Sequence, residues 1–156
     1  CCVDENKAML DLNKKKFKVN SNVKWFCNNA EKLPFKNDHF DYYTISFGIR
    51  NVSNLNNPLK EAYRVLKPGG RFLCLEFSKV KNKFLNKFYK AYSNTIPQIG
   101  KLVLGKSEPY EYLINSIEKF SSQEELFKQI KKQNFINVSY RNLSGGIVAI
   151  HSAWKV

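Results

Sequence analysis

Polar and charged side chains follow several apolar runs of this sequence, in positions suited to binding a ligand. Asp4 closes the first run, and Asn29 and Ala30 follow the second. Ser46 ends the third, with Arg50 four residues further on. If these runs are parallel strands, their carboxyl ends meet at the sheet edge where α/β proteins bind ligands. A carboxylate there can accept hydrogen bonds from both hydroxyls of a vicinal diol, although an Asp in this position also often caps a helix.

The spacing of apolar residues predicts strands that alternate with helices. We expect strands at 1–4, 23–27, 40–47, 71–77, 138–143 and 147–154, and helices at 6–16, 57–66, 79–92, 110–120 and from 122 onward. Gly69 and Gly70 should end the second helix. Ser122 with Glu125 predicts a capping box, and 144–146 should join the last two strands as an antiparallel hairpin. The alternation favours an α/β fold built on a parallel sheet.

Length and charge limit the class of protein. The 156 residues suit one domain over 1–156, and the apolar fraction of 43% is that of a globular core. No apolar run reaches the roughly 18 residues that a membrane span needs. A net charge of +13 favours an anionic membrane surface or nucleic acid as partner, unless the lysines are spread over solvated faces.

The cysteines indicate neither a disulfide framework nor a metal site. Cys1, Cys2, Cys27 and Cys74 form no CxxC pair. Cys27 and Cys74 lie in strand patterns, which predicts buried free thiols in a reducing compartment. The opening residues 1–4 resemble neither an initiator segment nor a signal peptide, so we expect the chain to start inside a strand, with an N-terminal part and any targeting signal missing.

Several motifs together resemble the ubiquinone/menaquinone biosynthesis C-methyltransferases of the UbiE type. They are NAEKLPF at 29–35, SFGIRN at 46–51, YRVLKPGG at 63–70, LEFS at 75–78 and NLSGGIVAIH at 142–151, with further matches at 92–100 and 110–117. LKPGG alone indicates only a class I methyltransferase. SFGIRN together with the closing block is specific to the quinone family.

The resemblance implies a Rossmann-like class I methyltransferase sheet with helices on both faces and a C-terminal antiparallel hairpin. The first strand and its Gly-rich loop are missing from the pattern. In this fold the first strand lies between the second and the fourth, so the strands ending at Asp4 and Cys27 should be separated from the rest. Unpaired strand edges then predict impaired cofactor affinity, marginal stability or pairing with another copy.

The resemblance also implies S-adenosylmethionine as cofactor and no metal. Asp4 matches the family's ribose-binding acid, and Asn29 and Ala30 match its adenine-side loop. Ser46 matches a cofactor contact near the transferred methyl group, and Phe47 belongs to the same wall. The alternatives are an ordinary Asx turn at Asn29 and a half-buried strand hydroxyl at Ser46.

The implied reaction is C-methylation of a polyprenyl benzoquinol or naphthoquinol, which needs the phenol to lose its proton to a base or a base-held water. Arg50 is the catalytic candidate, as a charge at the mouth of the site that stabilises the phenolate or polarises a water; the alternative is a solvent-facing salt bridge. Glu76 and Tyr92 are expected on the substrate side, unless Glu76 pairs with a basic residue. His39 should lie in a surface turn, and His151 should make a core hydrogen bond.

The substrate class implies partners and a location. A prenylated quinol lies in a membrane, and residues 79–106 mix large apolar side chains with lysines, which suits peripheral contact with anionic lipid. The alternative is a helix packed on the sheet with its lysines in solvent. The setting would be the matrix side of the mitochondrial inner membrane in a eukaryote or the cytoplasm in a bacterium. A homodimer or a quinone-biosynthesis complex is implied, and no nucleic acid. The other hypotheses are another class I small-molecule methyltransferase and a non-catalytic scaffold or basic binding module.

Overall fold

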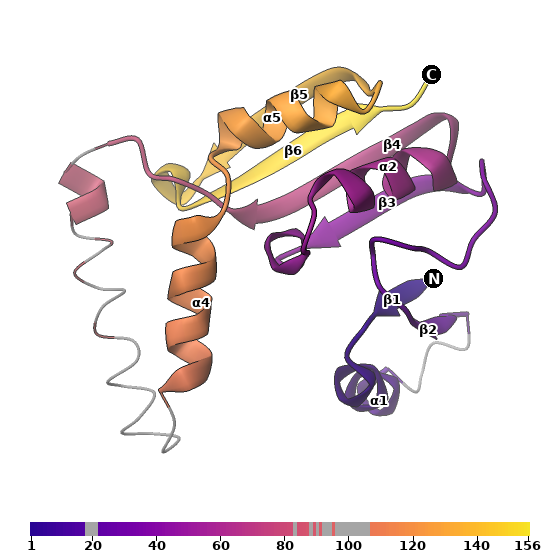
Figure 1. Cartoon of the computed structure of the whole chain (residues 1–156), viewed down its shortest axis with the longest axis horizontal. Helices are drawn as coiled ribbons and strands as arrows, with labels where there is room; N and C mark the ends of the chain where they lie inside the picture. Colours follow the sequence, from indigo (N-terminus) through magenta and orange to yellow (C-terminus); the bar gives the residue numbers. More distant parts are fainter. Residues whose placement is uncertain (18–21, 83, 88, 90, 92–94, 96–106) are drawn as a thin grey trace.

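The structure is a computed structural model that describes residues 1–17, 22–82, 84–87, 89, 91, 95 and 107–156 (Figure 1). In chain order its elements are β1 (Cys2–Asp4), α1 (Lys7–Lys16), β2 (Trp25–Cys27), β3 (Phe40–Ser46), the 3-10 turn η1 (Ile49–Asn51), α2 (Asn56–Val65), β4 (Leu66–Phe77), α4 (Glu108–Lys119), α5 (Gln123–Lys132), β5 (Ile136–Leu143), the 3-10 turn η2 (Ser144–Gly146) and β6 (Val148–Trp154).

The strands form two separate sheets. β1 and β2 pair in parallel, while the other four described strands pair in the order β3-β4-β6-β5. β3 and β4 are parallel, and β6 is antiparallel to both β4 and β5. The predicted α/β class and the closing hairpin are therefore confirmed. The separation of the first two strands from the rest is confirmed as well.

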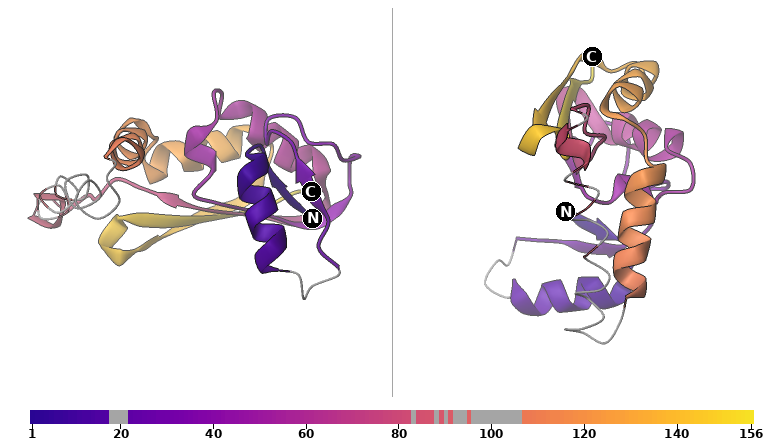
Figure 2. Two further views of the ribbon diagram at one scale, coloured as in Figure 1. Left: turned by 90° about the horizontal axis from the view of Figure 1, so that it is seen from below. Right: turned by 90° about the vertical axis from the view of Figure 1, so that its left-hand side faces the viewer.

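Helices α2 and α5 lie on the same side of the four-stranded sheet (Figure 2). Between them, Phe72 of β4 is fully buried, with its ring centroid 5.7 Å from that of Tyr43 and 5.3 Å from that of Phe135. Leu73 and Leu75, which point to the other face, are only half-buried. Among the described residues, the core therefore lies on the side of the sheet that α2 and α5 cover.

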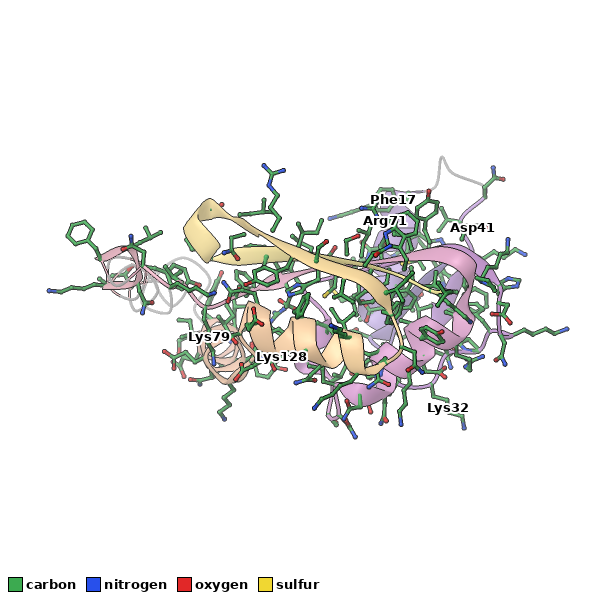
Figure 3. The ribbon with its side chains drawn as sticks, turned by 90° about the horizontal axis from the view of Figure 1, so that it is seen from above. Phe17, Lys32, Asp41, Arg71, Lys79 and Lys128 are labelled. Carbon is green, nitrogen blue, oxygen red and sulfur yellow. The ribbon has the colours of Figure 1, made fainter. Side chains whose placement is uncertain are left out.

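Local side-chain signals set the ends of two helices. Asn6 caps α1 by accepting a hydrogen bond from the Met9 amide at 3.2 Å. The predicted capping box of α5 is present, because Ser122 and Glu125 each bond the other's backbone amide. Figure 3 labels Arg71, midway along β4, and Lys79, two residues after its end. The Lys79 carbonyl accepts a hydrogen bond from the Gln123 side chain at the start of α5, at 3.1 Å.

The end of α2 differs from the prediction. The helix stops at Val65, and Leu66 is already extended and pairs with Phe40 of β3. The two glycines come too late to end it, because Lys67 precedes Pro68 and a residue before proline avoids the helical region. Pairing then resumes between Tyr42 and Arg71, so residues 67–70 form a bulge in β4 rather than a helix cap.

Gly70 is expected to be the less replaceable glycine of this bulge. A β-carbon on Gly70 would lie 2.7 Å from the Lys67 carbonyl oxygen and 3.2 Å from that of Asp41, whereas one on Gly69 would meet nothing within 4 Å. We expect Gly70→Ala to lower the free energy of unfolding by about 1–3 kcal/mol. Gly69→Ala should cost about 1 kcal/mol because its φ is +80°. Urea unfolding followed by circular dichroism checks this, and a Gly69 variant that is the less stable would contradict it.

One further expectation is corrected, and another falls partly outside the described residues. Cys74 is buried and free as predicted, but Cys27 is exposed, because it ends a three-residue strand that pairs on one side only. The helix expected over 79–92 lies partly outside the described residues, and Phe84, placed on its apolar face, is 74% exposed.

Candidate functional site

A cavity of about 650 Å³ lies at the carboxyl ends of β1 and β3. Its lining comes from β1 and the turn after it, the loop after β2, the end of β3, the η1 region and α4; it includes all the cofactor-binding residues expected from the sequence, namely Asp4, Asn29, Ala30, Ser46 and Phe47. This volume is typical of small-molecule sites. Residues up to 109 positions apart in the sequence, Val3 and Tyr112, are thus brought to one concave surface.

The β1 side of the cavity is organised by short hydrogen bonds. Asp4 accepts from the Asn6 amide at 2.8 Å, so Asp4 orients the cap of α1 and Asn6 is the cap itself. Asn29 accepts from the Glu31 amide at 2.7 Å, which is the Asx turn considered as its alternative, and it also donates to Glu5 at 2.9 Å. Asp4 and Asn29 are both exposed, so their side chains remain accessible to a ligand.

Glu31 is a lining residue to which the sequence analysis gave no role. Its carboxylate accepts from the Ser53 amide at 2.9 Å and from the Asn57 side chain at 2.8 Å. The hydrogen bond from Asn57 lowers the pKa of Glu31, so the group is charged at neutral pH. Glu31 therefore ties the loop after β2 to the start of α2. The position of Glu31 within the motif at 29–35 was the sequence feature that could have identified it as a site residue.

The β3 side of the cavity ends in an unusual backbone conformation. Ser46 is exposed at the end of the strand, and Phe47 has a φ of 53°, which is uncommon for a bulky residue. The Phe47 amide donates to the Leu75 carbonyl at 2.9 Å, and its ring lies 4.9 Å from that of Phe77. The Phe47 ring is 39% exposed and forms an apolar part of the wall.

Arg50 lies behind this wall and lines a second cavity, of about 520 Å³, together with Asn51 and Ser116. Its side chain is 9% exposed and pairs with the Glu76 carboxylate at 3.1 Å. Glu76 is 1% exposed, so it points toward Arg50 and not toward solvent. Burial raises the pKa of Glu76, although Arg50 and the Phe77 amide act in the opposite direction. Of the two placements considered for Glu76, the structure has the one that pairs it with a basic residue.

The two histidines discussed from the sequence do not line the cavity. Tyr92 is outside the described residues. His39 is an exposed loop residue, as predicted. His151 is buried and its Nε2 lies 2.9 Å from the Gln123 carbonyl, which confirms a core hydrogen bond, and burial lowers its pKa. Tyr112 of α4 was not singled out, yet it lines the cavity and donates to Asn51 at 3.2 Å.

Two features are absent from the described residues. These residues contain no group of three or more His, Cys, Asp or Glu side chains placed to hold a metal ion. None of the described helices has the length and apolar character required to span a bilayer.

Known structures share this fold. A SAM-dependent methyltransferase from Thermotoga maritima superposes with a TM-score of 0.70 at 21% identity, over 99% of this chain and 72% of its own. Haemonchus contortus phosphoethanolamine N-methyltransferase 2, solved in complex with S-adenosyl-L-methionine, has a TM-score of 0.68 at 14% identity, over 98% of this chain and 42% of its own. At these identities the likeness shows the Rossmann-like methyltransferase fold.

The sequence itself has much nearer relatives. The ubiquinone/menaquinone biosynthesis C-methyltransferase UbiE of Rickettsia prowazekii (strain Madrid E) is 56% identical over 157 residues, and that of Rickettsia bellii (strain OSU 85-389) is 55% identical. Each alignment covers 98% of this chain and 63% of the relative, so the chain spans less than two thirds of their length. The profile of the ubiE/COQ5 methyltransferase family matches residues 1–155. This chain therefore belongs to the ubiE/COQ5 methyltransferase family.

Proposed function

We propose that this chain carries the nucleoside-binding side of an S-adenosylmethionine-dependent C-methyltransferase that acts on a prenylated benzoquinol or naphthoquinol. The observation that carries the proposal is the shared cavity lined by Asp4, Ala30 and Ser46. The names of the curated relatives support the reaction class and the quinol substrate. Within the class I methyltransferases, this substrate is favoured over other small molecules because the relatives match across nearly the whole chain.

The residues of the cavity fit the proposed cofactor. The exposed Asp4 carboxylate suits the two hydroxyls of a ribose, because one group can accept both hydrogen bonds. The small Ala30 leaves room for a flat ring beside the Asn29 turn. Ser46 and Phe47 supply a hydroxyl and an apolar surface on the opposite side. When bound, S-adenosylmethionine supplies an electrophilic methyl group on a sulfonium centre.

The proposed reaction changes several bonds of the quinol. The phenol must first be deprotonated; a ring carbon of the quinol then forms the new C–C bond to the methyl group as the sulfur–methyl bond breaks and leaves a neutral thioether, and the proton of that ring carbon is lost to a base or a base-held water. Water must be kept out while the reacting atoms are aligned, and we assign this to the wall that Phe47 presents. Arg50 remains our candidate for the charged group of the site. Because its guanidinium is bonded to Glu76, we propose that it acts by holding the wall and not by contact with the phenolate.

The cellular setting follows from the same assignment. The relatives named above come from bacteria, which favours the cytoplasmic alternative over the mitochondrial one. The net charge of +13 supports peripheral contact with an anionic membrane, where a prenylated substrate lies. Most of the basic segment 79–106 falls outside the described residues. A homodimer or a complex with other quinone-biosynthesis enzymes is also proposed.

The decisive experiment maps binding on the cavity. We expect S-adenosylmethionine, titrated into ¹⁵N-labelled protein up to millimolar concentration, to shift the amide resonances of Asp4, Ala30 and Phe47. Asp4→Asn keeps the Asn6 contact but removes the charge, and should raise the Kd about tenfold through loss of a charge-assisted hydrogen bond. Asp11→Asn, on α1 and outside the cavity lining, is the matched control. Shifts spread over the surface, or an Asp4→Asn variant that binds as tightly as the natural protein, would contradict the proposal.

A further inference from the structure

Arg50 and Glu76 form a buried ion pair directly behind the cavity wall. Their side chains are 9% and 1% exposed, and the Arg50 Nη1 to Glu76 Oε1 distance is 3.1 Å. Glu76 also accepts from the Arg50 amide at 3.3 Å and from the Phe77 amide at 2.9 Å. The carboxylate is therefore held by three donors from two chain segments, which fixes its position within β4.

Arg50 extends this network to the cavity wall. The same Nη1 donates to the backbone carbonyl of Phe47, and Nε donates to Ser116 of α4 at 3.2 Å. The guanidinium lies 5.5 Å from the centre of the Phe77 ring, against which the Phe47 ring also packs. One side chain thus joins β3, β4 and α4 where they meet.

The contact on Phe47 falls where the backbone most needs support. Phe47 has a φ of 53°, a conformation that costs a non-glycine residue energy and persists only when its surroundings impose it. Phe47 and Asn51 line the cofactor cavity, while Arg50 is not among the lining residues. Arg50 therefore acts on the Phe47 wall of this cavity from behind, and itself lines the separate cavity of about 520 Å³.

We propose that Glu76 is a positioning residue of the site: by holding Arg50 against the Phe47 carbonyl, it fixes the surface that Phe47 presents to the cofactor. This proposal rests on the proposed function for the identity of the ligand. The effect on the Phe47 backbone is a property of the free protein and can be measured without any ligand.

Glu76→Asp tests the proposal while keeping the charge. The carboxylate is withdrawn by one methylene, so it cannot reach the Arg50 amide and guanidinium from the same position. We expect the amide resonances of Phe47 and Gly48 to shift in the free protein, and the Kd for S-adenosylmethionine to rise about tenfold, the effect of one charge-assisted hydrogen bond. The matched control is Glu61→Asp, which shortens the carboxylate of the Glu61–Arg64 pair outside the cavity and should change the Kd less than about twofold.

The outcomes separate this proposal from the proposed function. A Glu76→Asp variant with a lower unfolding midpoint but unchanged Phe47 resonances and Kd would make Glu76 merely structural and overturn the proposal. If the natural protein binds no S-adenosylmethionine at millimolar concentration, the proposed function fails, and the Phe47 resonances of the free variants still decide about positioning. Should Glu76→Asp not fold, Arg50→Lys replaces it, because a lysine keeps the charge but lacks the planar fork that serves carboxylate, carbonyl and hydroxyl together.

Discussion

Replacing Glu76 by leucine is expected to lower the free energy of unfolding by about 3–5 kcal/mol, enough to unfold a marginal protein. The loss does not measure the strength of the ion pair. It arises because the Arg50 guanidinium, 9% exposed, keeps its charge and loses its carboxylate partner in a largely buried position. Urea unfolding followed by the fluorescence of Trp25 and Trp154 measures the effect.

The double variant Arg50→Met/Glu76→Leu is the informative control. Burial raises the pKa of Glu76 despite the nearby guanidinium, so desolvation of this carboxylate outweighs its pairing. An apolar pair of similar size should therefore restore most of the stability lost in the single variant, to within about 1–2 kcal/mol of the natural protein. A double variant less stable than Glu76→Leu alone would show that the pair stabilises the fold and would refute this account.

The elements that the sequence predicts well are those with local signals. The capping box at Ser122 and Glu125 lies within one turn of helix, and the glycines of 144–146 lie within one hairpin. Both features could therefore be predicted from the local sequence alone. The end of α2 was misplaced because two local signals compete there. The restriction that Pro68 imposes on Lys67 acts before Gly69 is reached, so the helix ends earlier than the glycines suggest.

The sequence predicted which residues line the candidate site better than it predicted how those residues are packed. Asp4 and Ser46 end strands and Ala30 follows one, and parallel strands bring their carboxyl ends to one edge, which is why these residues line one cavity. The burial of Arg50 could not be read in the same way. It depends on Glu76, 26 residues away, and on Ser116, 66 residues away, and no spacing rule connects residues of different elements across a core.

This chain is expected to bind S-adenosylmethionine at least about 30-fold more weakly than the Rickettsia prowazekii relative, of which it covers 63%. The reason lies between β1 and β3, whose facing edges have no partner strand among the described residues and border a cavity of about 190 Å³. Asp4 and Ser46 therefore belong to two sheets that no backbone ladder joins. A ligand that contacts both must also order the two sheets, which costs about 2–5 kcal/mol in comparable coupled transitions.

Isothermal titration calorimetry on both proteins, in one buffer, tests this expectation. The chain should give a Kd well above the micromolar range, and the relative is the control for the quality of the ligand. Light scattering on the same samples is needed to determine the oligomeric state. Free strand edges can pair between two copies of the chain, and such pairing could fix the positions of the two sheets. If the chain binds with micromolar affinity as a monomer, the two sheets hold their relative positions without a strand between them, and the gap bordered by Val3 and Thr44 has no energetic consequence for binding.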